Sequence, residues 1–149
     1  MSESKRISEV EGNGWSFTYN MCHAPDYVLL TTHGQTTIER IKRLLEVIVA
    51  NRPLTRLSTG HICPIIVDLN EDTAPSAAVL RGTYDAIDRI IPQLSYVVFV
   101  LVPDHPDGTR MQMWLEALGV SVAPNLIVVS SLAHALEKVR VYHRWRSSH

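Results

Sequence analysis

Long apolar runs and an excess of basic charge are both missing from this sequence. The longest uninterrupted apolar run, residues 96–102, covers about seven residues, whereas a helix needs about 20 to cross a bilayer. The 14 Lys and Arg residues are balanced by 15 Asp and Glu residues, which gives a formal net charge of -1. A nucleic-acid-binding domain normally carries a basic field. The sequence therefore predicts neither a membrane span nor a nucleic-acid partner.

The sequence also lacks the residue spacings of most metal and cofactor sites. Its two cysteines, Cys22 and Cys63, form no CxxC pair and no dense disulfide framework, so we expect two buried free thiols. The seven histidines show no zinc-ligand spacing, and no glycine-rich phosphate loop occurs. The first ten residues lack the apolar core of a signal peptide. These absences predict a cytoplasmic protein with no metal and no cofactor.

The chain is long enough to form one globular domain with a sizeable core. It has 149 residues, of which 46% are hydrophobic and 19% charged, as in ordinary soluble domains. We expect the domain to span residues 14–142, after a flexible leader over residues 1–13. Residues 143–149 would form a C-terminal tail, in which Trp145 is large enough to pack on another surface.

Apolar patterns predict five strands. Residues 15–19 alternate apolar and polar side chains, as in a half-buried strand, and residues 27–32 would pair with them in antiparallel fashion. Residues 65–69, 96–102 and 125–129 are almost continuously apolar, which is typical of parallel strands that are buried on both faces.

Four helices are expected between and after these strands. Thr36 with Glu39 forms a capping-box pattern at the start of the first helix, and Ser130 or Ser131 would cap the last. The second helix would begin near Ser76, continue to Ile91 and carry Tyr84 on its inward face. The third would span residues 109–118 and close at Gly119, a favoured C-terminal residue. The order ββαβαβαβα predicts an α/β fold with a mixed, mainly parallel sheet.

Polar residues gather after two of the buried strands. In open α/β folds, ligands bind in the crevice beyond the carboxyl ends of the strands. The strand over residues 65–69 and the strand over residues 96–102 both lead into acidic or hydroxyl-rich loops. The candidate binding residues are Asp68, Asn70, Asp72, Thr73, Ser76, Asp104 and His105.

Each of these groups also has a plain structural interpretation. Carboxylates such as Asp68 and Asp72 suit a hard cation, but a solvated acidic loop explains them without a metal. Thr73 and Ser76 are candidate phosphoacceptors near a helix N-terminus, and either hydroxyl would equally serve as a helix cap. The turn that contains Asp104 would cap the third helix.

Three segments resemble the STAS domain, the fold of the bacterial anti-sigma-factor antagonists, and particularly its SpoIIAA-like relatives. They are the strand over residues 65–69 with the helix over 77–84, the strand over 96–101 after a proline-ended helix, and the closing segment over 126–136. The resemblance covers residues 15–141. It implies a non-enzymatic regulatory domain that binds a protein partner through the loops over residues 68–76 and 104–108.

The resemblance breaks at the position of the regulatory hydroxyl. Antagonist STAS domains carry an Asp-Ser-Ser/Thr-Gly motif at this helix start, where a partner kinase phosphorylates one hydroxyl. Aligning the helices places Thr73-Ala-Pro-Ser76 on that motif, with Pro75 at the phosphorylated position. Proline has no hydroxyl, so only Ser76 or Thr73, at a shifted position, would accept a phosphoryl group.

Two other interpretations of the same segments are possible. The strand end over residues 67–70 is similar to the phosphoacceptor site of a response-regulator receiver, but the acidic pair and the lysine of a receiver are missing. The alternative function is a protein that binds a nucleotide or a lipid-like molecule, or a weak hydrolase, in the same crevice. A homodimer is also expected, because open sheet edges and Trp145 invite pairing.

Overall fold

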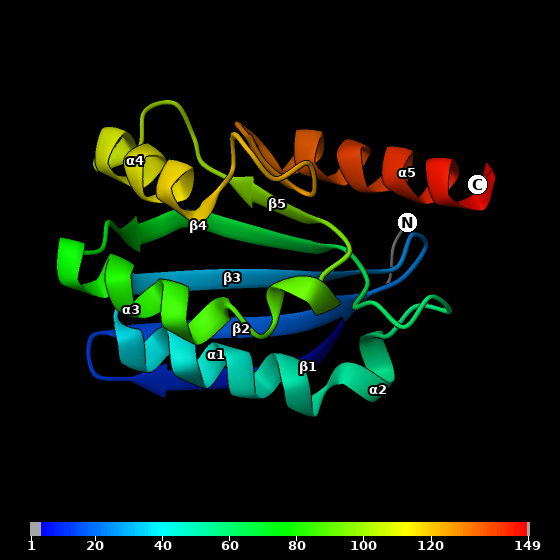
Figure 1. Cartoon of the computed structure of the whole chain (residues 1–149), viewed down its shortest axis with the longest axis horizontal. Coiled ribbons are helices and arrows are strands. Elements are labelled where there is room, and N and C mark those ends of the chain that lie inside the picture. Colours follow the sequence, from blue (N-terminus) through cyan, green and yellow to red (C-terminus); the bar gives the residue numbers. More distant parts are fainter. Residues whose placement is uncertain (1–3, 149) are drawn as a thin grey trace.

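The computed structural model of the chain describes residues 4–148 and contains one six-stranded sheet (Figure 1). The strands lie in sequence order from one edge to the other: β1 (Ser4–Gly12), β2 (Trp15–Cys22), β3 (Tyr27–Gln35), β4 (Ile65–Thr73), β5 (Val97–Val100) and β6 (Leu126–Val129). The first three strands pair antiparallel, and β3 to β6 pair parallel. The predicted mixed, mainly parallel α/β class is confirmed, with one more strand and one more helix than expected.

The additional strand replaces most of the expected flexible leader. Ser4–Gly12 pairs with β2 across the Asn13-Gly14 turn, so the prediction of a leader is wrong for these residues; residues 1–3 lie outside the described part. Asn-Gly is a strong hairpin signal. The strand before it was not predicted because its sequence is mostly polar, as an edge strand can be. Gly12 is required there, because a Cβ atom would overlap the indole ring of Trp15.

Helices cover both faces of the sheet. One face is covered by α1 (Ile38–Ala50), α3 (Ala77–Ile87) and α4 (Gly108–Leu118), and the other by α5 (Leu132–Ser148) (Figure 1). Val47 and Leu115 pack in the larger core on the first face, while Val139 packs in the smaller core on the second. The short helix α2 (Arg52–Thr55) and the 3-10 turn η1 (Ile91–Gln93) lie in the connections that lead to β4 and β5.

Several helix ends differ from the sequence prediction. Thr37, and not Thr36, caps α1, and its Oγ1 accepts a hydrogen bond from the Arg40 backbone N at 3.2 Å. Helix α3 ends at Ile87 because the chain then enters the turn that leads to η1. Helix α5 begins after Ser131, whose Oγ accepts from His134 N at 3.1 Å, and continues through the expected tail. Gly119 closes α4 in the left-handed conformation, as predicted.

Both cysteines are buried free thiols, as the sequence predicted. Burial raises the pKa of Cys63 to about 12, and it also raises the pKa of Cys22. Across residues 4–148, no helix has the length and hydrophobicity that a membrane crossing requires.

Candidate functional site

The expected acidic loop after β4 is mostly a continuation of that strand. Hydrophobicity predicted an end at Leu69, whereas β4 continues to Thr73 and pairs with the last residues of β3. Glu71, Asp72 and Thr73 stand opposite His33, Gly34 and Gln35, after an irregularity in the register. Backbone pairing with β3 therefore holds a polar sequence in a strand, and the loop before α3 shrinks to residues 74–76.

Asp72 is buried beneath this strand end and does not reach the surface. Its two carboxylate oxygens accept hydrogen bonds from Arg40 Nη1 at 2.9 Å and Nη2 at 2.8 Å, and both side chains are buried. Arg40 Nη2 also donates to Thr36 Oγ1 at 2.7 Å, and Thr36 donates to the Thr73 carbonyl at 3.0 Å. Burial raises the pKa of Asp72, against the opposing effect of Arg40. This residue positions the end of β4 and offers no exposed carboxylate to a partner.

Asp68 and Asn70 stabilise the strand ends. Asp68 is half-buried, and its Oδ1 accepts from the Asn70 backbone N at 3.0 Å. Asn70 Oδ1 in turn accepts from Val102 N at 3.1 Å. This second bond ties the end of β4 to the segment that follows β5, which the strand patterns did not reveal.

A second link joins the loops before α3 and α4. Asp107 Oδ2 accepts from the Ala74 backbone N at 2.9 Å, and its own N donates to His105 Nδ1 at 2.9 Å. Because Nδ1 accepts this bond, the proton of a neutral His105 lies on Nε2. Nε2 is buried and has no hydrogen-bond partner within the described part of the chain. Asp104 lies exposed in the same loop.

The two candidate phosphoacceptors lie exposed around the start of α3. Ser76 caps this helix, with its Oγ accepting from Val79 N at 3.4 Å, as the cap interpretation predicted. Thr73 Oγ1 donates to the Gly34 carbonyl at 3.4 Å. Both residues are exposed, so each hydroxyl is accessible from solvent while it serves the local structure.

The outer face of α3 was not identified from the sequence. Periodicity placed Tyr84 inward, but 46% of this residue is exposed. Thr83 is the buried residue of the helix, and its Oγ1 donates to the Val79 carbonyl at 2.7 Å. Gly82 lies against Ile38 of α1, and this close approach sets the rotation of α3. Gly82 was the residue in the sequence that could have revealed the orientation of α3, because a glycine within a helix often marks the side that packs closely on a neighbour.

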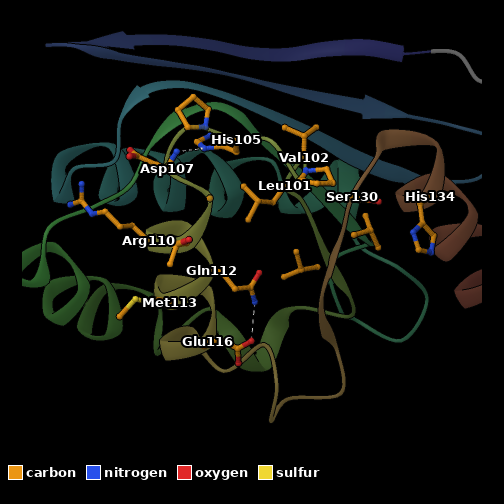
Figure 2. Close-up of a pocket in the computed structure, with 16 residues that line it drawn as sticks. Leu101, Val102, His105, Asp107, Arg110, Gln112, Met113, Glu116, Ser130 and His134 are labelled. Atoms are coloured by element: carbon orange, nitrogen blue, oxygen red, sulfur yellow. Dashed lines mark hydrogen bonds between the residues drawn. The ribbon is translucent and has the colours of Figure 1, made fainter.

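A wide hollow of about 1040 Å³ opens beyond the ends of β5 and β6. Figure 2 shows it beside α4, with His105 and Asp107 at one end and Ser130 and His134 opposite. Leu101, Val102, Val128 and Val129 supply apolar lining. Of its polar lining residues, only His105 was among the candidate binding residues; the others are Asp107, Thr109, Arg110, Gln112, Glu116, Ser130 and His134.

Two polar groups of this hollow, Gln112 and Glu116, lie one turn apart on α4. Glu116 accepts from Gln112 Nε2 at 2.9 Å and from the Ser121 hydroxyl, and these hydrogen bonds lower the pKa of Glu116. Among residues 4–148 there is no group of three His, Cys, Asp or Glu side chains that could hold a metal ion.

Comparison with known proteins identifies a solved structure of similar fold. No family model and no curated protein matches the sequence. An uncharacterised DUF3478-family protein from Shewanella loihica PV-4, described as having a SpoIIAA-like fold, superposes with a TM-score of 0.58. The two share 14% identity, and the match covers 87% of this chain and 98% of that one. The chain has a SpoIIAA-like fold.

A second solved structure is an anti-sigma factor antagonist from Mycobacterium paratuberculosis. It matches with 14% identity over 93% of this chain and 95% of that chain, with a TM-score of 0.48. The DUF3478-family match confirms, at the level of the fold, the resemblance that the three segments predicted. In this SpoIIAA-like fold, α3 starts directly after Pro75 and Ser76.

Proposed function

We propose that this SpoIIAA-like chain is a regulatory, non-enzymatic domain that binds a protein partner through α3 and the loops beside its start. The observation that carries the proposal is that hydrogen bonds fix the loops beside the start of α3, while the outer side of α3 itself is exposed. Hydrogen bonds accepted by Asn70 and Asp107 tie β4 and the loop before α3 to the segment between β5 and α4, while Tyr84 on α3 is 46% exposed. A preorganised surface with an exposed aromatic residue resembles the anchor region of many protein interfaces.

The charge of this surface is milder than the sequence alone suggested. Asp72 is neutralised by Arg40 inside the protein, which leaves Glu71, Asp85 and Asp104 as exposed carboxylates and Arg81 as an exposed cation. We therefore propose a partner that receives Tyr84 in an apolar pocket and surrounds it with polar and basic groups. Such a rim adds specificity and association rate more than affinity.

Affinity purification with paired variants tests this proposal. The tagged wild-type chain, Tyr84→Ala and Val122→Ala are used as baits, and Val122 serves as control because it is 86% exposed and lies in the α4–β6 connection. We expect Val122→Ala to retain the partner and Tyr84→Ala to weaken binding by about 30-fold, as an aromatic hot-spot residue would. Equal recovery of every partner by both variants would contradict the proposal.

We also propose Ser76 as the residue that regulates this surface, with Thr73 as the alternative acceptor. A phosphate on Ser76 would lie at the N-terminus of α3, where the helix dipole favours negative charge. Intact-mass measurement of protein purified from its native cells should reveal one added phosphate. The modification should persist in Thr73→Ala and disappear in Ser76→Ala; an unmodified wild-type protein contradicts this part.

The proposed setting is a cytoplasmic homodimer. Strand β6 forms one edge of the sheet, and α5, on one face, presents Trp145 at 58% exposure and Val141 at 45%. Tyr142 stacks on Tyr96 at 5.2 Å between ring centroids, which anchors this part of α5 to the domain. A fixed helix with exposed apolar side chains is a suitable surface for a second copy of the chain.

A second candidate function is the binding of a nucleotide in the surface hollow. It is favoured by the buried His105 Nε2–H group, which has no acceptor in the described structure, beside a hollow of about 1040 Å³. Calorimetric titration with ATP and GTP tests it. Binding that His105→Ala abolishes supports this function, and the absence of any saturable heat signal contradicts it.

A further inference from the structure

An apolar chamber, partly open toward the surface, lies between the sheet and the helices α1, α3 and α4. Its volume is about 150 Å³, and it shares no lining residue with the surface hollow. Its wall consists almost entirely of aliphatic and aromatic side chains, among them Leu44, Ile48, Ile87, Phe99, Trp114 and Leu118.

Most polar side chains on the wall already make hydrogen bonds within the protein. Thr32 donates to the Asp68 carbonyl at 3.2 Å and Thr83 to the Val79 carbonyl at 2.7 Å. Thr36 and Arg40 are engaged with each other, with Thr73 and with Asp72.

One donor on the wall has no acceptor. The Nε1 group of Trp114 is buried without a hydrogen-bond partner among residues 4–148. A buried water molecule typically needs two to four polar partners, so a single donor does not hold one. The chamber wall therefore offers no site for an ordered water molecule.

We propose that this chamber is a binding site for a small, uncharged, mainly apolar molecule of about the size of one aromatic ring. A cavity of about 150 Å³ lined by Leu, Ile and Phe side chains stays dry and takes up benzene. Native cores are packed with few voids larger than a water molecule, so an apolar space of this size between the sheet and its helices is an unusual feature. Burial of apolar ligand surface supplies the driving force, and a charged ligand of the same shape is excluded by its desolvation cost.

Helix α3 is the natural point of entry. It contributes Thr83 and Ile87 to the wall, and Ile90 and Ile91 follow it. Thr83 is its only buried residue, whereas α1 buries four. Because less burial holds α3 in place, it can open at a lower free-energy cost than α1, which would admit a ligand without unfolding the sheet.

Methyl NMR of the full chain, with toluene and benzoate as probes, tests the proposal. We expect toluene to shift the methyl signals of chamber residues such as Leu44, Ile48 and Ile87 in a saturable way. Benzoate, which has a similar size but a negative charge, should leave them unchanged. Two results would overturn the proposal: no saturable shift up to the solubility of toluene, or equal binding of benzoate.

A matched pair of substitutions locates the site. Val67→Phe adds volume from the floor of the chamber, whereas Val122→Phe makes the same change at an exposed position. We expect Val67→Phe to weaken toluene binding at least tenfold and Val122→Phe to leave it unchanged. Unchanged binding in a folded Val67→Phe protein contradicts the proposal. If Val67→Phe does not fold, the wild-type shifts decide, since shifts confined to surface methyls also contradict it.

Discussion

At the scale of single residues, the Arg40–Asp72 ion pair shows that burial decides whether a carboxylate contacts a partner or stabilises the fold. Both side chains are buried, and the pair is bidentate at 2.8 and 2.9 Å. A buried pair contributes little relative to a well-packed apolar replacement, but removal of one partner leaves an uncompensated charge in the interior. Asp72 thus affects any partner surface indirectly, through the position of β4.

Asp72→Ala should lower the free energy of unfolding by about 3–5 kcal/mol, because Arg40 would remain buried and charged. The matched control is Glu71→Ala, one residue earlier on β4 but exposed, which should change stability by less than about 0.5 kcal/mol. Urea unfolding of the three proteins measures both effects. Similar midpoints for the two variants would show that the ion pair is not essential to stability.

Cys63 should make stability depend on pH in the alkaline range. Its folded pKa of about 12 lies above the ordinary thiol value, because burial disfavours the thiolate. The stability contributed by the protonated thiol is therefore complete below about pH 8.5 and is lost as pH rises toward 12. Urea unfolding between pH 8 and 10 should give a decline of up to about 1.4 kcal/mol per pH unit from this residue. Cys63→Ala should decline less steeply, and equal slopes would refute the assignment.

At the scale of elements, two glycines allow the cost of a positive φ to be distinguished from the cost of a steric overlap. Gly34 in β3 and Gly60 before β4 both have positive φ, 89° and 92°. A Cβ at Gly34 would overlap the Gly14 carbonyl oxygen, whereas a Cβ at Gly60 would meet nothing within 4 Å.

Gly60→Ala should therefore cost about 1–2 kcal/mol, the conformational cost alone. Gly34→Ala should cost at least about 2 kcal/mol more, because the β2–β3 pair must also move apart. Thermal and urea unfolding measure the difference. Equal losses in the two variants would mean that the β1–β2 turn yields without cost.

Helix α3 should open more readily than the rest of the fold. It buries one residue, and the chamber lies beneath it. Native-state hydrogen exchange should therefore report faster exchange for α3 amides than for those of α1, the control helix of similar length with four buried residues. Equal protection of the two helices would contradict this prediction.

At the scale of the whole molecule, the two faces of the sheet have different coverings. Three helices lie over one face and line the chamber, while α5 lies over the other and carries exposed apolar side chains. The proposed partner surface and the proposed dimer surface lie on different helices, so both can be occupied together.

Light scattering should therefore report a dimer for the wild-type chain and a monomer for Trp145→Ala. The aromatic side chain would provide much of the buried area, and its loss shifts the equilibrium by about 2 kcal/mol or more. Val122→Ala, at another exposed apolar position, should remain dimeric. A monomeric wild-type protein at high concentration would contradict the dimer proposal.

The sequence by itself determined the order of most elements and several of their ends. Apolar periodicity identified five of the six strands and four of the helices, because burial acts on neighbouring residues through a fixed repeat. Ser76 and Gly119 were assigned correctly as helix ends, because a cap depends on bonds within one turn.

The tertiary structure alone decided which polar groups reach the surface. Arg40 and Asp72 are 32 residues apart, and they meet because β4 continues past its apolar part in register with β3. The fold also formed the chamber, whose wall comes from three helices and the sheet. These features depend on strand register and helix rotation, which long-range packing sets and no local repeat in the sequence encodes.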